Sequence, residues 1–159
     1  MDRDNLDGVL DSVQSFYRYN DWMKQVYQQY KFHLDVDLAT IFIEDFLGLQ
    51  QVPERIVPIP LHPEMVQTRT FSQVDELLIA AQVPFTHALE KTLNRSQVGK
   101  SKKDRISSEL IFKVRGNVHN QDILLVDDLY TTGTTLHHAA YVLKHAGARS
   151  VKAITLIRA

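Results

Sequence analysis

The C-terminal third of the sequence has the pattern of a strand, a helix and a second strand, and this pattern constrains the fold more than any other feature. Residues 122–126 end in four consecutive apolar residues, which is typical of a strand buried on both faces of a parallel sheet. Residues 134–146 place apolar side chains on one helical face and are followed by Gly147, a common helix terminator. Residues 150–157 are rich in Val, Ile and Thr and indicate another strand. Strands that alternate with helices predict an α/β fold with a parallel sheet and right-handed crossovers.

The middle of the chain is expected to add a further strand and a helix to this unit. Residues 55–60 form a short apolar run that ends in two prolines, and proline cannot donate a hydrogen bond within a sheet, so the strand should end there. Ser72 is placed to cap a helix over residues 73–82. Shorter elements are expected beyond this helix: a strand at 83–85, a helix at 86–93 and a strand at 110–114.

The first third of the chain is predicted to be helical. Apolar and aromatic side chains recur at helical spacing over residues 22–30 and again over residues 38–49, and Asp21 is a plausible cap for the first helix. We interpret these aromatic residues mainly as core packing. The chain is therefore expected to form one compact domain, with a helical segment at 1–52 and the core at 53–159.

Composition excludes several classes of protein. With 18 Lys and Arg against 19 Asp and Glu, the net charge is −1, which argues against wholesale wrapping by nucleic acid but leaves room for a local basic patch. The absence of cysteine excludes disulfides, thiol nucleophiles and cysteine-bound zinc. The first residues are polar and do not resemble a signal peptide, and no apolar run is long enough to span a membrane. We expect a cytoplasmic protein with no membrane insertion.

Two acids and a threonine-rich turn follow the strand at 122–126. Asp127 and Asp128 come at its carboxyl end, where open α/β sheets bind ligands. The four threonines and Gly133 of residues 131–135 then lead into a helix, so that backbone N–H groups and the helix dipole form an anion site. Carboxylates would repel a phosphate, but they suit sugar hydroxyls or Mg²⁺ on the same ligand. The segment therefore indicates a ribose 5-phosphate unit, although an Asp-rich turn with a purely structural role remains an alternative.

Residues 127–135, DDLYTTGTT, resemble the signature with which type I phosphoribosyltransferases bind 5-phosphoribosyl 1-pyrophosphate (PRPP). More narrowly, the chain resembles the ComF family of competence proteins along nearly its whole length, including residues 57–62 (VPIPLH), 69–73 (RTFSQ) and 155–158 (TLIR). It departs from that family at three positions: Thr70 stands in place of Gly, and Ser72 and Ser108 stand in place of Asn. It also lacks the cysteines of the zinc ribbon with which many members begin.

The resemblance implies a type I phosphoribosyltransferase-like parallel sheet flanked by helices, with an N-terminal helical hood over the site. It implies binding of PRPP or ribose 5-phosphate with Mg²⁺, the metal not being held by the protein alone, and transfer of the phosphoribosyl group to or from a nitrogen acceptor. Asp127 and Asp128 would bind the ribose hydroxyls or Mg²⁺. The 5-phosphate would be bound by Tyr130, Thr131, Thr132, Gly133, Thr134 and Thr135, and the pyrophosphate by Leu61, His62 and Arg69. For Arg69, a surface salt bridge is the alternative.

The segment 95–105 carries five basic residues and one acid. By the resemblance it is the mobile loop that closes over pyrophosphate during turnover, with Lys102, Lys103 and Arg105 as catalytic residues and Lys100 beside them. A solvated surface loop and a contact for single-stranded DNA are the alternatives.

In biology the resemblance implies a role in DNA uptake during natural competence, beside a helicase-like ComF partner, with single-stranded DNA as a further candidate partner. The competing hypothesis is a non-catalytic adaptor or PRPP sensor, which would keep the pocket and act by binding competence proteins or DNA. The sequence does not identify an acceptor base.

Overall fold

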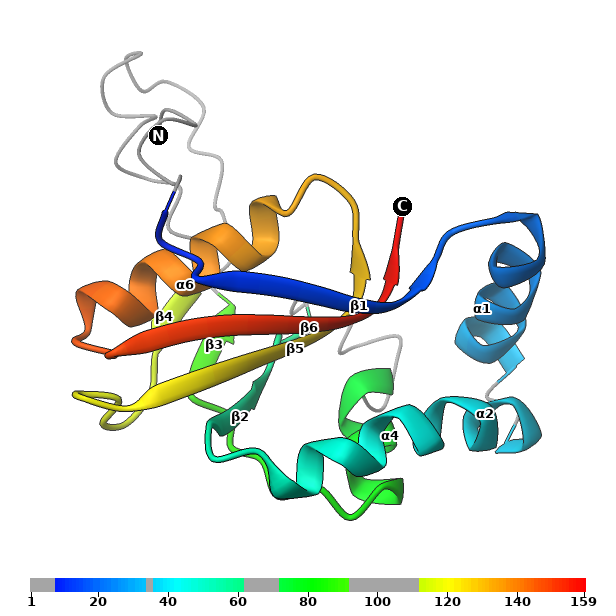
Figure 1. Ribbon diagram of the computed structural model, residues 1–159, viewed down its shortest axis with the longest axis horizontal. Helices are drawn as coiled ribbons and strands as arrows, with labels where there is room; N and C mark the ends of the chain where they lie inside the picture. Colours follow the sequence, from blue (N-terminus) through cyan, green and yellow to red (C-terminus); the bar gives the residue numbers. More distant parts are fainter. Residues whose placement is uncertain (1–7, 34–35, 62–71, 92–111) are drawn as a thin grey trace.

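The computed structural model describes residues 8–33, 36–61, 72–91 and 112–159. Its centre is a four-stranded parallel sheet with the strand order β1-β6-β5-β2, next to a two-stranded antiparallel sheet of β3 and β4 (Figure 1). The α/β expectation is confirmed. The strands are β1 (Ser12–Arg18), β2 (Arg55–Pro58), β3 (Leu89–Lys91), β4 (Phe112–Val114), β5 (Asp122–Tyr130) and β6 (Ser150–Arg158).

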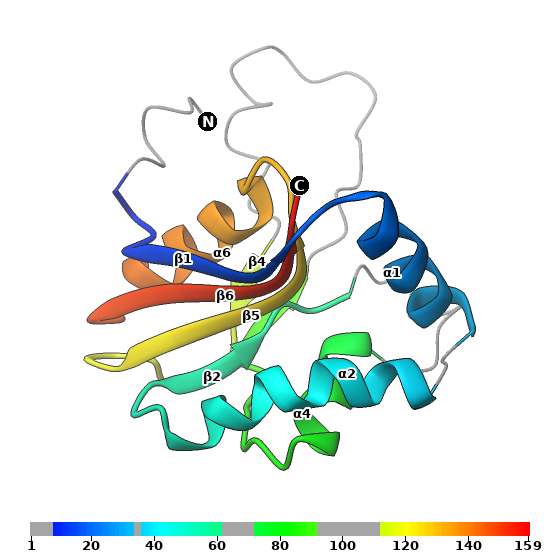
Figure 2. The ribbon, with the colours of Figure 1, turned by 45° about the vertical axis from the view of Figure 1, so that its right-hand side comes forward.

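Helices lie on both faces of the parallel sheet. Helix α6 covers one face, α2 and α4 cover the other, and α1 lies near the carboxyl ends of the strands (Figures 1 and 2). The helices are α1 (Asp21–His33), α2 (Val36–Leu47), the 3-10 helix η2 (Gly48–Gln51), α4 (Gln73–Ala80) and α6 (Thr134–His145). None of the helices in the described part of the chain is long and apolar enough to cross a membrane.

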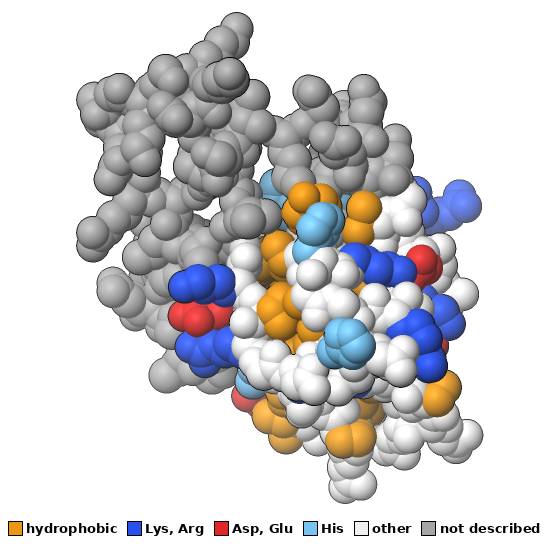
Figure 3. All heavy atoms as spheres, turned by 90° about the vertical axis from the view of Figure 1, so that its left-hand side faces the viewer, with side chains coloured by type: hydrophobic (Ala, Val, Ile, Leu, Met, Phe, Trp, Pro, Cys, Tyr) orange, Lys and Arg blue, Asp and Glu red, His pale blue; other side chains and the backbone are white. Residues whose placement is uncertain are grey.

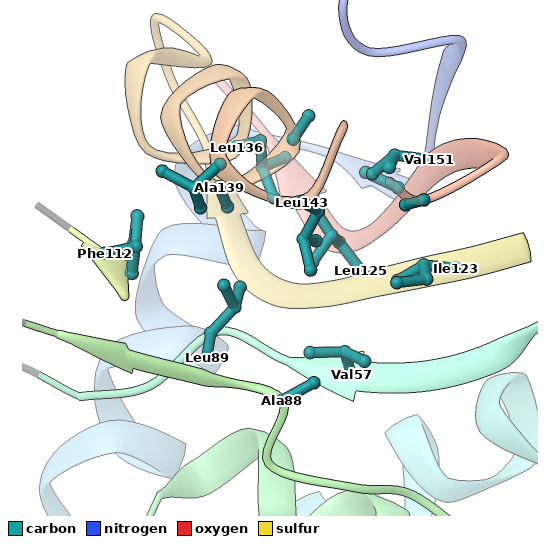
Figure 4. Close-up of a cluster of buried hydrophobic side chains, with 14 of the residues drawn as sticks. Val57, Ala88, Leu89, Phe112, Ile123, Leu125, Leu136, Ala139, Leu143 and Val151 are labelled. Carbon is teal, nitrogen blue, oxygen red and sulfur yellow. The ribbon is translucent and has the colours of Figure 1, made fainter. Parts of the chain in front are cut away.

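The apolar run of β5 is explained by two cores, one on each face of the sheet. Ile123 and Leu125 pack into the core under α6, together with Leu136 and Leu143 of that helix (Figure 4). Leu124 and Val126 point to the opposite core, which α1, α2 and α4 complete. Because both faces of β5 are buried, both sets of alternating positions must be apolar.

The prediction of a wholly helical first third is wrong for Ser12–Arg18, which forms the strand β1. This strand pairs in parallel with β6, 140 residues away in sequence, from Ser12 opposite Lys152 to Arg18 opposite Arg158. It lies at the edge of the sheet and keeps exposed polar residues, so it lacks the continuous apolar run of β5. The first 52 residues therefore contribute a strand to the sheet as well as helices.

Two shorter predictions are also corrected. The segment predicted as a helix at 86–93 contains β3, which pairs antiparallel with β4, and residues 83–85 form no regular element. The first helix is capped by Asn20 and not by Asp21, because the Met23 N–H donates to Asn20 Oδ1 at 2.7 Å. The Ser72 cap is confirmed, since its side chain accepts from Asp75 N.

Ion pairs concentrate at the amino-terminal end of the sheet. Arg149 binds Asp122 through its guanidinium, and Lys152 Nζ lies 2.8 Å from Glu54 Oε1. Figure 3 faces this end of the sheet, where basic and acidic side chains lie beside one another. The hydrogen bonds from Arg149 and Ser150 hold the pKa of Asp122 well below its usual range. The carboxylate that opens β5 is thus neutralised within the protein.

Candidate functional site

Asp127 and Asp128 lie inside β5, near its carboxyl end. The strand was expected to end at Val126, but it continues to Tyr130 because its parallel pairing with β6 extends as far as Arg158. Pairing runs without interruption from Asp122 to Asp127 and resumes at Leu129, and the strand bends in this region (Figure 1). Both carboxylates are partly buried and remain accessible at the ligand-binding edge of an α/β sheet.

The two carboxylates are tied to each other and to helix α1. The Asp128 backbone N–H donates to Asp127 Oδ1 at 2.9 Å, and the Tyr27 hydroxyl donates a short hydrogen bond to Asp128 Oδ2. Tyr27 was assigned to the apolar face of the first helix and not to the site. The sequence feature that could have pointed to a role in the site is its phenol, since a buried tyrosine usually finds a hydrogen-bond partner.

Asp127 differs electrostatically from the acid at the other end of the strand. Desolvation by burial, reinforced by the neighbouring Asp128 carboxylate, raises the pKa of Asp127 to about 8. The positive charge of Lys91 opposes this shift and lowers the pKa, but by less. Burial and the neighbouring charge disfavour the ionised form of this carboxyl group. A ligand that donates hydrogen bonds to it or brings a cation would stabilise the ionised form, and a Mg²⁺-bound sugar phosphate would do both.

The turn between β5 and α6 has the geometry of an anion site. Gly133 precedes the helix with a φ of +74°, a left-handed conformation that glycine adopts without strain. The hydroxyls of Thr132 and Thr134 lie 2.9 Å apart, and both residues are exposed. With Thr134 the first residue of the twelve-residue helix α6, free N–H groups and the positive end of the helix dipole face this turn.

Tyr130 supports the turn from the end of β5. A β-carbon on Gly133 would lie only 2.5 Å from the Tyr130 hydroxyl oxygen, so the ring and the turn are in close contact. The Arg158 guanidinium lies 4.9 Å from the centre of the same ring, and the Ala159 N–H donates to the Tyr130 carbonyl at 2.9 Å. The end of β6 therefore holds the turn in place. Direct phosphate binding by Tyr130 stays a prediction.

Of the residues predicted for pyrophosphate, only Leu61 lies within the described part of the chain. The Ile59 N–H donates to the Val126 carbonyl at 2.9 Å, so the chain leaves β2 beside the point where the acids begin, and Leu61 follows with a partly exposed side chain. The other residues predicted for this role and for the loop lie outside the described residues: His62, Arg69, Lys100, Lys102, Lys103 and Arg105.

The raised pKa of Asp127 predicts how stability changes with pH. The unfolded chain releases this proton near pH 4 and the folded chain near pH 8, so the folded state binds more protons between these values. The free energy of unfolding should therefore fall between pH 4 and pH 8, and the pKa shift of Asp127 should account for about 5 kcal/mol of this fall. Urea unfolding of the wild-type chain and of Asp127→Asn across this range gives the free energy of unfolding at each pH. The difference between the two slopes of this free energy against pH measures the contribution of Asp127.

Asp122→Asn is the matched control on the same strand. The pKa of Asp122 is already lowered, so its carboxylate stabilises the fold above pH 4 and its removal should destabilise the protein at every pH in this range. If the free energy of unfolding changes with pH equally in the wild type and in Asp127→Asn, the raised pKa of Asp127 is contradicted.

Comparison with known proteins identifies the family of the chain. The family described as Phosphoribosyl transferase domain matches residues 66–159, which include the acids, the threonine turn, α6 and β6. The chain therefore belongs to the phosphoribosyl transferase domain family. The resemblance to the ComF competence proteins is also confirmed, because two curated relatives match almost the entire chain.

Competence protein ComFC of Bacillus subtilis is 39% identical over 163 residues, covering 98% of this chain and 67% of the relative. Competence protein ComFC of Streptococcus pneumoniae is 36% identical over 156 residues, covering 96% of this chain and 70% of the relative. Among solved structures, the allosteric regulatory enzyme of purine biosynthesis matches with a TM-score of 0.48 and 21% identity, over 71% of this chain and 25% of that one. The chain spans about two thirds of the length of the ComFC relatives.

Proposed function

We propose that the chain binds PRPP together with Mg²⁺ at the carboxyl end of β5. The observation that carries this proposal is the succession of two partly buried carboxylates and a glycine-led helix N-terminus in one strand–turn–helix unit. Asp127 and Asp128 accept hydrogen bonds from the ribose hydroxyls. The turn residues Thr131 to Thr135, with the N–H groups at the start of α6, bind the 5-phosphate.

The bound ligand would react by phosphoribosyl transfer. The bond between ribose C1 and the pyrophosphate oxygen breaks, a nitrogen acceptor bonds to C1, and pyrophosphate departs with its electron pair. The chain's contribution is positioning and stabilisation of the departing charge. Leu61, His62 and Arg69 would bind the pyrophosphate, and Lys102, Lys103 and Arg105 would close over it.

The donor set in the site suits Mg²⁺ only as part of a complex with the ligand. Among the described residues no group of three or more His, Asp or Glu side chains could hold a metal ion. Mg²⁺ prefers one or two carboxylates plus phosphate oxygens and water, which Asp127, Asp128 and PRPP would supply together. The metal would neutralise pyrophosphate beside these acids.

The biological setting is proposed from the relatives. Both ComFC proteins are named for competence, so we place this chain in DNA uptake during natural competence, in the cytoplasm. A helicase-like ComF partner and single-stranded DNA are the proposed macromolecular contacts. A non-catalytic PRPP sensor in the same setting would use the same pocket and differ only in turnover.

Calorimetry with PRPP tests the binding step. We expect Mg²⁺ to tighten PRPP binding at least tenfold relative to the same titration in chelator, because the acids repel the ligand's pyrophosphate until a cation bridges them. Equal affinity in the two buffers would count against the arrangement. A screen for pyrophosphate release across nucleobases then separates the enzyme from the sensor, since only the enzyme releases pyrophosphate in the presence of its acceptor.

A further inference from the structure

The proposed function leaves one contact at the acid pair unused, the hydrogen bond from Tyr27 to Asp128. It joins residues 101 positions apart and connects helix α1 directly to the site. Asp128 is a residue that the ligand itself would contact, so whatever fixes its carboxylate also affects recognition of the ligand.

Tyr27 is held in a fixed position by its own surroundings. Its side chain is only 5% exposed and packs in the same core as Met23, Val26 and Phe46. The start of α1 is anchored as well, because Asn20 caps the helix and the Tyr19 N–H donates to the Arg158 carbonyl at 2.7 Å. A phenol this buried does not move away readily when a ligand arrives, so the contact should persist in the bound state.

The contact leaves most of the capacity of Asp128 for a ligand. An ionised carboxylate accepts about four hydrogen bonds, and the phenol uses one of them, on Oδ2. The backbone N–H of Asp128 meanwhile donates to Asp127 Oδ1, so the two carboxyl groups are oriented relative to each other as well as to α1. Two neighbouring carboxylates in a fixed relative orientation match two neighbouring hydroxyls.

We propose that Tyr27 is a positioning residue that orients Asp128 for a vicinal diol and thereby makes the site selective for ribose over 2-deoxyribose phosphates. This inference rests on the proposed function, because it assumes that the acid pair binds sugar hydroxyls. A phenyl ring at position 27 would keep the aromatic packing and remove the hydroxyl that donates to Asp128, so the diol would meet a carboxylate without this restraint.

A second tyrosine–aspartate pair supplies a matched control. The Tyr17 hydroxyl of β1 donates to Asp45 Oδ2 of α2 at 2.6 Å, and the Tyr17 ring packs edge-on against Phe42. This pair joins a strand to a helix as the Tyr27 pair does, but its carboxylate does not belong to the acid pair of β5. Tyr17→Phe therefore reports the structural cost of losing such a bond.

The experiment compares ribose 5-phosphate with 2-deoxyribose 5-phosphate by calorimetry on the whole chain. We expect the wild type to bind ribose 5-phosphate at least tenfold more tightly. In Tyr27→Phe this ratio should fall to threefold or less, with 2-deoxyribose 5-phosphate affinity changing less than twofold. Tyr17→Phe should keep the wild-type ratio, with thermal melts confirming that each variant is folded.

The outcomes separate this inference from the proposed function. If the wild type binds neither sugar phosphate, the proposed function falls and the role of Tyr27 falls with it. If the wild type binds with the expected selectivity and Tyr27→Phe keeps it, or loses affinity for both ligands equally, only the role of Tyr27 is overturned. A loss of selectivity in Tyr17→Phe equal to that in Tyr27→Phe would also overturn it.

Should Tyr27→Phe fail to fold, labelling of the wild type supplies the measurement. The chain has six tyrosines, and fluorine NMR of 3-fluorotyrosine protein resolves them, with assignment from Tyr→Phe changes at the other positions. The resonance of Tyr27 should shift with ribose 5-phosphate more than with 2-deoxyribose 5-phosphate. An equal response to the two ligands overturns the inference.

Discussion

Replacement of both Asp127 and Asp128 by asparagine is expected to weaken Mg²⁺-PRPP binding by at least tenfold while leaving the protein folded. The carboxylates would supply the negative charge that strengthens hydrogen bonds from the ribose hydroxyls and attracts the metal, and an amide carries no charge. The fold should survive because the asparagine at position 128 keeps an oxygen that accepts from Tyr27, and because the change removes a desolvated charge from Asp127. Calorimetry for binding and urea unfolding at pH 8 measure the two effects, and the free energy of unfolding should rise.

The control for this double variant is Asp122→Asn at the start of the same strand. It removes a carboxylate that Arg149 and Ser150 bind, so it should lower stability and leave PRPP affinity unchanged. Unchanged affinity in the Asp127→Asn, Asp128→Asn variant, measured beside this control, would sink the assignment of the site.

Gly133→Ala is expected to lower the free energy of unfolding by about 1–3 kcal/mol and to weaken binding of the 5-phosphate at least tenfold. Alanine would be strained at a φ of +74°, and its β-carbon would lie 2.5 Å from the Tyr130 hydroxyl oxygen. Relief of this clash has to move either the Tyr130 ring or the turn, and the turn carries the N–H groups that would bind the phosphate. Thermal or urea unfolding and calorimetry with ribose 5-phosphate measure both effects.

Gly147→Ala is the control, because it would introduce similar backbone strain at the other end of α6. Gly147 has a φ of +94°, and a β-carbon there would lie 2.7 Å from the His119 ring. This variant should lose stability comparably and keep ribose 5-phosphate affinity. If both glycine variants lose affinity to the same extent, the effect of Gly133→Ala reflects general destabilisation and not the phosphate site.

Local sequence was sufficient for the parts of the molecule whose partners lie nearby in the chain. The acids, the threonine turn and α6 are consecutive, so a single strand–turn–helix segment predicts an anion site next to two carboxylates. The Ser72 cap and the glycine after α6 follow from the same kind of local rule, because their hydrogen-bond partners lie within five residues.

Features that depend on partners distant in the sequence could be established only from the folded chain. The strand β1 has no strong pattern of its own, and it becomes a strand because β6 offers its edge 140 residues away. Pairing of β5 with the other edge of β6 extends β5 beyond Val126 and so places the acids within the strand.

The electrostatics of the site also depend partly on local sequence and partly on distant partners. The local sequence predicts that two carboxylates stand together before a helix N-terminus. It did not determine that burial and proximity raise the pKa of Asp127, or that Tyr27 binds Asp128, because both depend on which side chains the folded chain packs around the acids. Residue identity and short-range spacing set the chemical groups that are available, whereas long-range packing sets their charge and orientation.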